Sequence, residues 1–373
     1  MLIKFSVKNF RGFPGRLEWD LSHPSNYSFN AFAVSDGVVR CGIVYGRNGS
    51  GKTNLGLALM DIVCHLTQKH RPQGYYDHFA YMGNAAAPVE FEYIFRLDGE
   101  TMRYAYSKTR DGRLTDETLA VEGKSVFERR GRKFSIDGAA FPMGEATRKA
   151  LVEGDSQVSI VNFLLASYPL AADNCLMRLR RFVEGMLWTG RSSAPDDFIG
   201  LEDHVPVPEE YIVRKGLTEG LRQFLKTVSG EEFRFVAPRS GDGRLLCEMG
   251  KERAPFAATA SAGMQALARL YFRMQQMQRA TLVFIDDFDA SCHYATAFEL
   301  SRRLFNLPPQ VFTTAHTTFL MTNELLRPDC NFLLHDGSIH ALCDLTRKEL
   351  RAGHNIEKIY RGNGFGGGGQ EPA

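Results

Sequence analysis

Alternating apolar and polar positions predict that the first part of the chain is rich in strands. Residues 2–8 alternate, and residues 16–21 do so again after a turn. Residues 89–97 and 102–107 alternate on either side of Asp98-Gly99, which is a strong β-hairpin signal. Further short strands are expected at residues 114–121, 125–129 and 133–136. The segments from residue 89 onward follow a first helix and predict a β-rich subdomain.

The pattern changes near residue 145 and is helical to about residue 230, interrupted by Pro195, Pro206 and Pro208. Strand character returns at residues 233–236 and 245–249. We interpret the middle as a helical insertion between two halves of one α/β domain. The expected division is 1–145 for the N-terminal half with the β-subdomain, 146–232 for the insertion, 233–362 for the C-terminal half, and 363–373 for a flexible glycine-rich tail.

A glycine-rich loop follows the apolar run at residues 38–45 and precedes a helical pattern of Leu55, Leu59, Ile62 and Leu66. The loop has the pattern G-x-x-x-x-G-K-T, in which backbone N–H groups converge on phosphate oxygens at a helix N-terminus. The pattern predicts binding of ATP with Mg²⁺. The expected nucleotide-binding residues are Gly46, Asn48, Gly49, Ser50, Gly51, Lys52, Thr53 and Asn54.

Within that loop two side chains have specific expected roles. Lys52 would reach the β- and γ-phosphates and take part in catalysis, and the Thr53 hydroxyl would bind Mg²⁺.

A short apolar strand, residues 282–285, ends in two acids, Asp286 and Asp287. In phosphate-loop ATPases an acid at the end of such a strand holds Mg²⁺, and this role is expected for Asp286. Asp287 would orient the attacking water, where related ATPases mostly carry glutamate. Because aspartate is one methylene shorter, slow hydrolysis is expected. The alternative interpretation is a strand end with two capping acids.

Two further segments complete the candidate site. Ser261 and Gly263 begin a helix whose N–H groups could meet a phosphate, although serine is also simply a good N-cap. His316 ends the strand at residues 311–316, where open α/β sheets place ligand groups, and it could contact the γ-phosphate. A lone histidine is more often structural. His293 is a weaker candidate for a loop that crosses between protomers.

Composition adds few constraints. The 373 residues carry a net charge of +2 and 44% hydrophobic residues, which is ordinary for a globular protein and gives no overall basic field for nucleic acid. Basic clusters at 129–133 and 178–181 could still contact phosphates, and the favoured interpretation is that each is a solvated face. The seven cysteines form no C-x-x-C pair, no signal peptide is evident, and the most apolar stretch, 159–172, is too short to span a bilayer. We expect a cytoplasmic protein that does not contact the membrane.

The order of phosphate loop, Ser-x-Gly helix, acidic strand and histidine strand resembles the ABC/SMC-like ATPases. Residues 1–13, 284–293, 313–316 and 354–366 resemble segments of the OLD and RloA type, as in the ATPase subunits of the PARIS and Septu anti-phage systems. The resemblance covers residues 1–140 and 245–366 well and the helical middle poorly. It implies an α/β fold: an ABC-type P-loop NTPase domain with a mixed sheet, a β-rich subdomain and a helical insertion.

The resemblance also implies partners. Two ATP molecules would lie between head-to-tail protomers, each phosphate loop facing Ser261 and Gly263 of the other copy. Nucleotide would then control assembly. The chain ends within about sixty residues of His316, which leaves no room for the fused Toprim nuclease of OLD proteins. A separate effector, a nuclease or toxin, and a phage-protein or DNA trigger are therefore expected.

Three alternatives stay open. An SMC-type ATPase of DNA repair or chromosome maintenance is one, although the middle shows no sustained heptads. A transporter ATPase is another, and the long interval between Lys52 and Asp286 argues against it. The last is a nucleotide-binding scaffold with negligible turnover, which Asp287 keeps open.

Overall fold

The computed structural model describes most of the chain, and its ranges are 1–131, 133–153, 158–190, 196–204, 207–236, 243–290 and 293–365. Several positions considered above lie outside these ranges: Arg132, Pro195, Pro206, Ser291, Cys292 and the tail from Gly366 onward. No helix among the described residues combines the length and the apolar character that crossing a bilayer requires.

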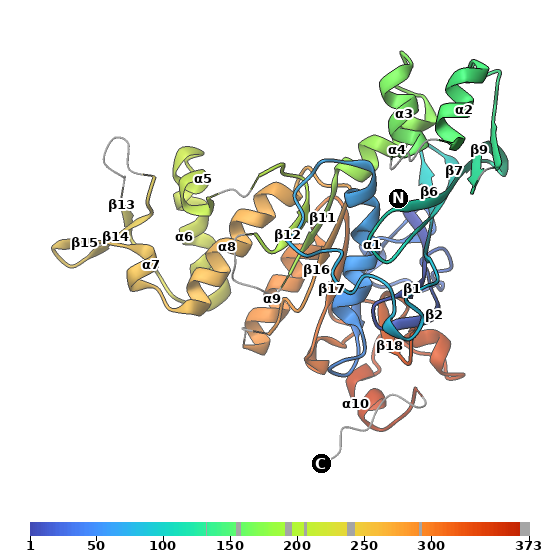
Figure 1. The fold of residues 1–373 in the computed structure, drawn as a ribbon. Helices are drawn as coiled ribbons and strands as arrows, with labels where there is room; N and C mark the ends of the chain where they lie inside the picture. The colour runs from blue at the N-terminus through green and yellow to red at the C-terminus, as the bar shows by residue number, and fades with distance from the viewer. Residues whose placement is uncertain are drawn as a thin grey trace.

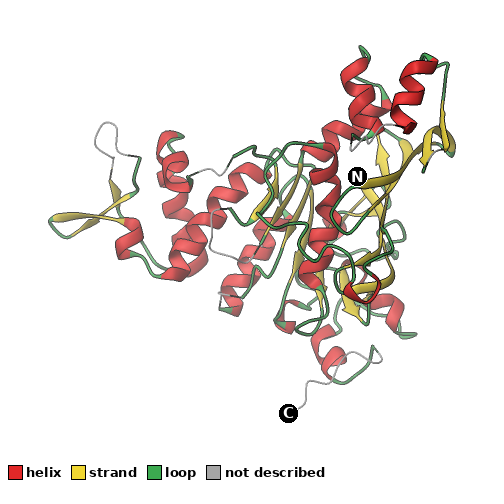
Figure 2. Cartoon of the chain, in the orientation of Figure 1, coloured by secondary structure: helices red, strands yellow, loops and turns green. Residues whose placement is uncertain are grey.

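A seven-stranded mixed sheet forms the centre of the molecule, in the order β12-β11-β16-β17-β5-β18-β19 (Figures 1 and 2). The inner strands are parallel, and β12 and β19 pair antiparallel at the edges. Their bounds are β5 Cys41–Tyr45, β11 Met186–Thr189, β12 Phe198–Gly200, β16 Leu282–Ile285, β17 Gln310–Thr314, β18 Asn331–His335 and β19 Ser338–Ala341. β5, β16 and β17 are buried at every residue. This explains the continuous apolar sequence of β16, because a parallel sheet is covered on both faces.

A second sheet of seven antiparallel strands has the order β10-β9-β8-β7-β6-β1-β2. Its strands are β1 Leu2–Phe10, β2 Phe13–Asp20, β6 Val89–Leu97, β7 Glu100–Lys108, β8 Leu114–Val121, β9 Lys124–Arg130 and β10 Lys133–Ile136. Asp98 and Gly99 have φ of 51° and 88°, which confirms the predicted hairpin turn. Every strand predicted from alternation in this region is confirmed.

Helix α1 (Lys52–Leu66) lies between the two sheets and contacts β11, β12 and β1 (Figure 1). Trp19 of β2 also packs between the two sheets, with its ring 4.7 Å from Phe312 and 5.4 Å from Phe332 of the central sheet. On the side away from α1 lie α8 (Ala262–Met277) and α9 (Tyr294–Phe305). The predicted fold class, α/β with a mixed sheet and a β-rich subdomain, is confirmed.

The region predicted to be helical is more varied than its sequence pattern indicates. It contains α2 Glu145–Glu153, α3 Ile160–Ser167 and α4 Cys175–Glu184, then the strands β11 and β12, then α5 Pro208–Arg214 and α6 Thr218–Ser229. β11 pairs with β16 in the central sheet. Its apolar run matches a helix as well as a buried strand, because a short continuous run has no diagnostic period. The two helical groups lie at opposite ends of the molecule (Figure 1). The domain boundaries at 145, 232 and 362 stay predictions.

The remaining strands and α-helices lie outside the two large sheets. A three-stranded sheet beside α5 and α6 consists of β13 Phe235–Val236, β14 Leu246–Met249 and β15 Glu252–Pro255, followed by α7 Phe256–Thr259. The others are β3 Val34–Ser35, β4 Val38–Val39 and α10 Ile356–Arg361.

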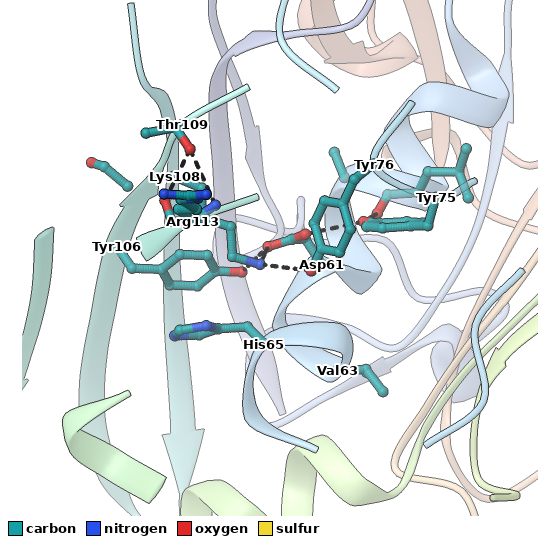
Figure 3. A network of polar contacts seen from close by, with 12 residues as sticks. Asp61, Val63, His65, Tyr75, Tyr76, Tyr106, Lys108, Thr109 and Arg113 are labelled. Carbon is teal, nitrogen blue, oxygen red and sulfur yellow. Dashed lines mark hydrogen bonds and ion pairs between the residues drawn. The ribbon is translucent and has the colours of Figure 1, made fainter. Parts of the chain in front are cut away.

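A buried ion pair joins α1 to the antiparallel sheet (Figure 3). Nζ of Lys108, on β7, lies 2.7 Å from Oδ2 of Asp61, and both side chains are almost completely buried. The Tyr106 hydroxyl donates to the same oxygen at 2.8 Å, and the Tyr75 hydroxyl, which donates to the carbonyl oxygen of Leu57 at 2.9 Å, lies 3.3 Å from Oδ1. Lys108 also lies over the ring of Tyr76, 5.3 Å from its centroid. The buried carboxylate thus has a cation and a hydroxyl donor on Oδ2, partners that a buried charge requires.

The polar network continues one turn later along α1. His65 Nε2 lies 2.8 Å from the Tyr104 hydroxyl, which donates to the buried Glu117 at 2.7 Å. Glu117 also accepts from Ser159 Oγ at 2.6 Å and from the N–H of Ile160, at the start of α3. Because Tyr104 gives its only proton to Glu117, the proton between His65 and Tyr104 belongs to Nε2 of a neutral imidazole. Burial lowers the pKa of His65 well below 6.5.

Replacing Lys108 by methionine should lower the free energy of unfolding by about 3–5 kcal/mol, because the Asp61 charge stays buried without its cation. The matched control is Lys8→Met, which breaks the exposed pair with Glu90 and should cost at most about 1 kcal/mol. Denaturant unfolding measures both values. Equal losses in the two variants would contradict the assigned importance of the buried pair.

His65 should make the fold less stable in acid. Its folded pKa lies below the unfolded value, so the unfolded chain binds more protons, and stability falls as the pH drops below about 6.5. The loss is at most about 1.4 kcal/mol per pH unit. Unfolding at pH 7.5 and 5.5 should show a smaller acid loss for His65→Gln than for wild type. The control His340→Gln, at an exposed site on β19, should keep the wild-type loss.

Candidate functional site

The glycine-rich loop connects β5 to α1 and is closed so tightly that two of its glycines cannot be replaced. A Cβ on Gly46 would lie 2.5 Å from Ser50 Oγ and 2.7 Å from the carbonyl oxygen of Leu334. Gly51 caps α1 with φ of 100°, and a Cβ there would lie 2.8 Å from the ring of Phe13. The antiparallel sheet, through Phe13, therefore supports the loop. The free N–H groups of the first turn of α1 form an anion-binding end.

Lys52 bends back over its own loop. Its Nζ donates to the carbonyl oxygens of Gly46, at 2.8 Å, and Arg47, at 3.4 Å. Burial lowers its pKa, and the carboxylates of three aspartates oppose that shift: Asp287, Asp286 and Asp289. The ammonium group thus lies in the field of the acids that follow β16.

Thr314, the last residue of β17, connects the two predicted acids. Its hydroxyl donates to Asp286 Oδ1 at 2.7 Å and accepts from the N–H of Asp287 at 2.7 Å. The Thr53 side chain also lies close enough to lower the pKa of the Asp286 carboxylate. Burial raises the pKa of Asp286, and the two hydroxyls partly oppose this. The ends of β16 and β17 and the start of α1 therefore meet at Asp286.

Thr53 and Asp286 form a donor set that fits Mg²⁺. A hydroxyl and a carboxylate are hard oxygen ligands of the type that Mg²⁺ takes, and a buried carboxylate with a raised pKa gains from a nearby divalent cation. No group of three or more His, Cys, Asp and Glu side chains able to hold a metal occurs in the described part of the chain. The ion would therefore complete its shell with water and phosphate oxygens, as Mg²⁺ usually does.

Asp287 and His316 form a direct contact, with Nε2 of the imidazole 2.8 Å from Oδ1 of the carboxylate. Asp287 has φ of 48°, in the left-handed region that few residues other than glycine adopt. The N–H groups of His316 and Thr317 donate to a third acid, Asp289.

These groups surround a cleft of about 670 Å³, a size typical of small-molecule sites. Its lining consists of Asn48, Gly49, Gly51, Lys52, Thr53, Asn54, Asp287, Ala290 and His316. Eight of these nine were predicted from sequence, and the structure brings them together. Five predicted residues do not line the cleft: Gly46 and Ser50 shape the loop, Asp286 lies behind it next to Thr53, and Ser261 and Gly263 lie elsewhere. The roles of all the predicted residues toward a nucleotide stay predictions.

Ser261 and Gly263 lie apart from the cleft lining, at the N-terminus of α8. Ser261 is exposed, and its Oγ accepts from the N–H of Met264 at 3.3 Å. Within one chain Ser261 acts as the N-cap of α8, and the expected role of Ser261 and Gly263 toward a partner's nucleotide stays a prediction. His293 is likewise the N-cap of α9.

Sequence reasoning missed two residues, Thr314 and Asp289. A polar side chain at the last position of an apolar strand was the available signal for Thr314, because such positions face the ligand edge of a parallel sheet. Asp289 carried no comparable signal, since it lies in a loop and contacts backbone groups from another strand.

No protein-family model matches the chain, and no curated protein matches it. Among solved structures it is similar to an SMC head bound to the C-winged helix domain of ScpA, with 15% identity, a TM-score of 0.47, and 91% of this chain and 95% of that chain covered. It is also similar to an SMC head domain from Thermotoga maritima, with 13% identity, a TM-score of 0.43, and 91% of this chain and 98% of that chain covered. A third similar structure is an SMC head domain with an extended coiled coil, bound to the C-terminal domain of ScpA derived from Pyrococcus furiosus. Here the identity is 12%, the TM-score is 0.47, and 92% of this chain and 97% of that chain are covered. At these identities the similarity concerns the fold alone.

Proposed function

We propose that this chain is an ABC-like ATPase that binds ATP with Mg²⁺ and hydrolyses it slowly. The observation that carries the proposal is the cleft in which Lys52 and Thr53, at the start of α1, face Asp287 and His316, which follow β16 and β17. The buried Asp286, beside Asp287, holds the Thr314 hydroxyl at 2.7 Å. A phosphate-binding loop thus meets acids at the place where a nucleotide-bound Mg²⁺ belongs, which a chance loop motif would have no reason to do.

Each residue around the cleft then has a separate role in the reaction. The N–H groups of the loop and Lys52 hold the phosphates, and Thr53 and Asp286 hold Mg²⁺, which neutralises phosphate charge when bound. Asp287 orients a water whose oxygen attacks the γ-phosphorus while the bond to the β–γ bridging oxygen breaks. The proton of that water passes to the Asp287 carboxylate. His316, beside Asp287, lies in the lining of the cleft and contacts the γ-phosphate.

Asp287 also supports slow turnover. Its Oδ1 already accepts from His316 and lies 3.3 Å from the Thr314 hydroxyl, so only Oδ2 is left for the water. The shorter side chain reaches less far into the cleft than a glutamate would. A switch with slow hydrolysis fits this arrangement better than a motor does.

The finer proposal is a role in anti-phage defence. Two copies would associate head to tail around two ATP molecules, with Ser261 and Gly263 of one copy at the phosphate loop of the other. The assembly would hold or release a separate effector, a nuclease or toxin, in response to a phage protein or DNA. Support comes from the resemblance of residues 1–13, 284–293 and 354–366 to the OLD and RloA type, and from the exposed position of Ser261.

Lys52→Ala should weaken ATP binding at least tenfold, because the phosphates lose their cation. Asp287→Asn should bind ATP as wild type does but lower phosphate release about 100-fold, because the amide cannot take a proton. Titration calorimetry with Mg²⁺-ATP and a phosphate-release assay measure the two effects. The control is Lys69→Ala, which removes an ion pair with the exposed Asp203 and should change neither. Unaltered binding by Lys52→Ala would refute the assignment of the cleft.

A mixing experiment tests the composite site. Ser261→Arg should bind ATP as a single chain yet fail to associate or hydrolyse, because its own cleft is intact and its partner-facing surface is blocked. Mixed with Lys52→Ala, it should regain turnover, since each mixed dimer contains one site with both residues unaltered. Light scattering follows association, and phosphate release follows turnover. A mixture as inactive as its components would rule out head-to-tail sharing.

A further inference from the structure

Asp289 is a buried acid beside the cleft with no role in the mechanism above. Its side chain is 6% exposed, and it is absent from the cleft lining. Its Oδ2 accepts from the N–H of Thr317 at 2.9 Å and from the N–H of His316 at 3.1 Å, and Oδ1 lies 3.2 Å from the same His316 nitrogen. One carboxylate thus holds two consecutive backbone groups.

These two groups lie just beyond the end of the central sheet. The N–H of Ala315 still donates to Val44 of β5, at 3.2 Å. After Ala315 the chain leaves the strand register, and the N–H groups of His316 and Thr317 donate to Asp289 instead. Hydrogen bonds from N–H groups to an ionised acceptor are among the stronger ones in proteins. Asp289 therefore fixes the backbone from which the His316 side chain extends.

The position of that backbone decides where the imidazole ring lies. The ring reaches Asp287 at 2.8 Å and lines the cleft, although it is one-third exposed and projects from a residue outside the sheet. Asp289 follows β16 and His316 follows β17, so the contact also fixes the two strand-end loops relative to each other. A shift of about 1 Å at such a group can lower a rate about 100-fold.

We propose that Asp289 is a positioning residue, which acts on the reaction by holding the backbone of His316 and neither binds the metal nor takes the proton. This inference rests on the proposed ATP hydrolysis. It follows from two facts: the carboxylate does not reach the cleft, and its hydrogen bonds end on the main chain of a residue that does.

Two substitutions separate the possible roles. Asparagine keeps an oxygen acceptor but loses the charge, whereas alanine loses both. We expect Asp289→Asn to keep turnover within about threefold of wild type, and Asp289→Ala to lower kcat at least tenfold, with the KM for ATP within about twofold. If kcat of Asp289→Asn falls as far as kcat of Asp289→Ala, the charge itself acts as ligand or base, and the proposal is wrong.

A double-mutant cycle with His316→Ala tests whether the effect passes through His316. In that background Asp289→Ala should cause no further loss in single-turnover release of labelled phosphate. A further loss as large as in wild type would overturn the proposal, because Asp289 would then act independently of the imidazole.

Amide hydrogen exchange supplies a readout that does not need turnover. The segment with the N–H groups of His316 and Thr317 should exchange slowly in wild type and Asp289→Asn, and at least tenfold faster in Asp289→Ala. Equal exchange in all three would show that Asp289 does not hold this backbone. If wild type hydrolyses no ATP, the proposed function fails, and the exchange rates still decide whether Asp289 positions His316.

Discussion

Three neighbouring parallel strands, β16, β17 and β5, end at one edge of the central sheet, and the candidate site depends on this arrangement. Parallel strands present their carboxyl ends on the same side, so residues far apart in sequence become neighbours. The three strands are wholly buried, and the polar residues of the candidate site follow at their ends. Thr314 and Asp289 then bridge adjacent strand ends and hold the acids and the histidine in place.

Helix α1 connects this edge to the rest of the molecule. Its first turn carries Lys52 and Thr53, and its later turns carry Asp61 and His65, whose partners belong to the antiparallel sheet. A rotation of α1 against that sheet would leave the Asp61 carboxylate buried without Lys108, at a cost of several kcal/mol. Glu117 extends the connection to the start of α3. The phosphate loop, the antiparallel sheet and α3 are therefore held as one unit by buried polar contacts that are costly to break.

The parts that sequence predicted are those with a local signal. The hairpin at Asp98-Gly99 needs a particular backbone, and the loop before Lys52 needs glycines, so residue types alone reveal both. The strand β11 was missed because its run of apolar residues has no period of its own. The contacts of Thr314 and Asp289, and the pairing of Asp61 with Lys108, were beyond prediction for another reason. They depend on which strands become neighbours, and no short stretch of sequence records the order of strands in a sheet.

At residue 287 this chain has aspartate where related ATPases mostly carry glutamate, and the backbone conformation gives a physical reason for the difference. With φ of 48°, this position lies in the left-handed region, where aspartate and asparagine are tolerated because a short polar side chain can bond nearby backbone or side-chain groups. Asp287 does so: its carboxylate meets His316 at 2.8 Å, and its own N–H donates to Thr314. A glutamate here would face the same backbone strain, with a longer side chain that must fold back to reach these partners. The shorter acid therefore matches the conformation of the loop, and its limited reach toward a water follows from the same geometry.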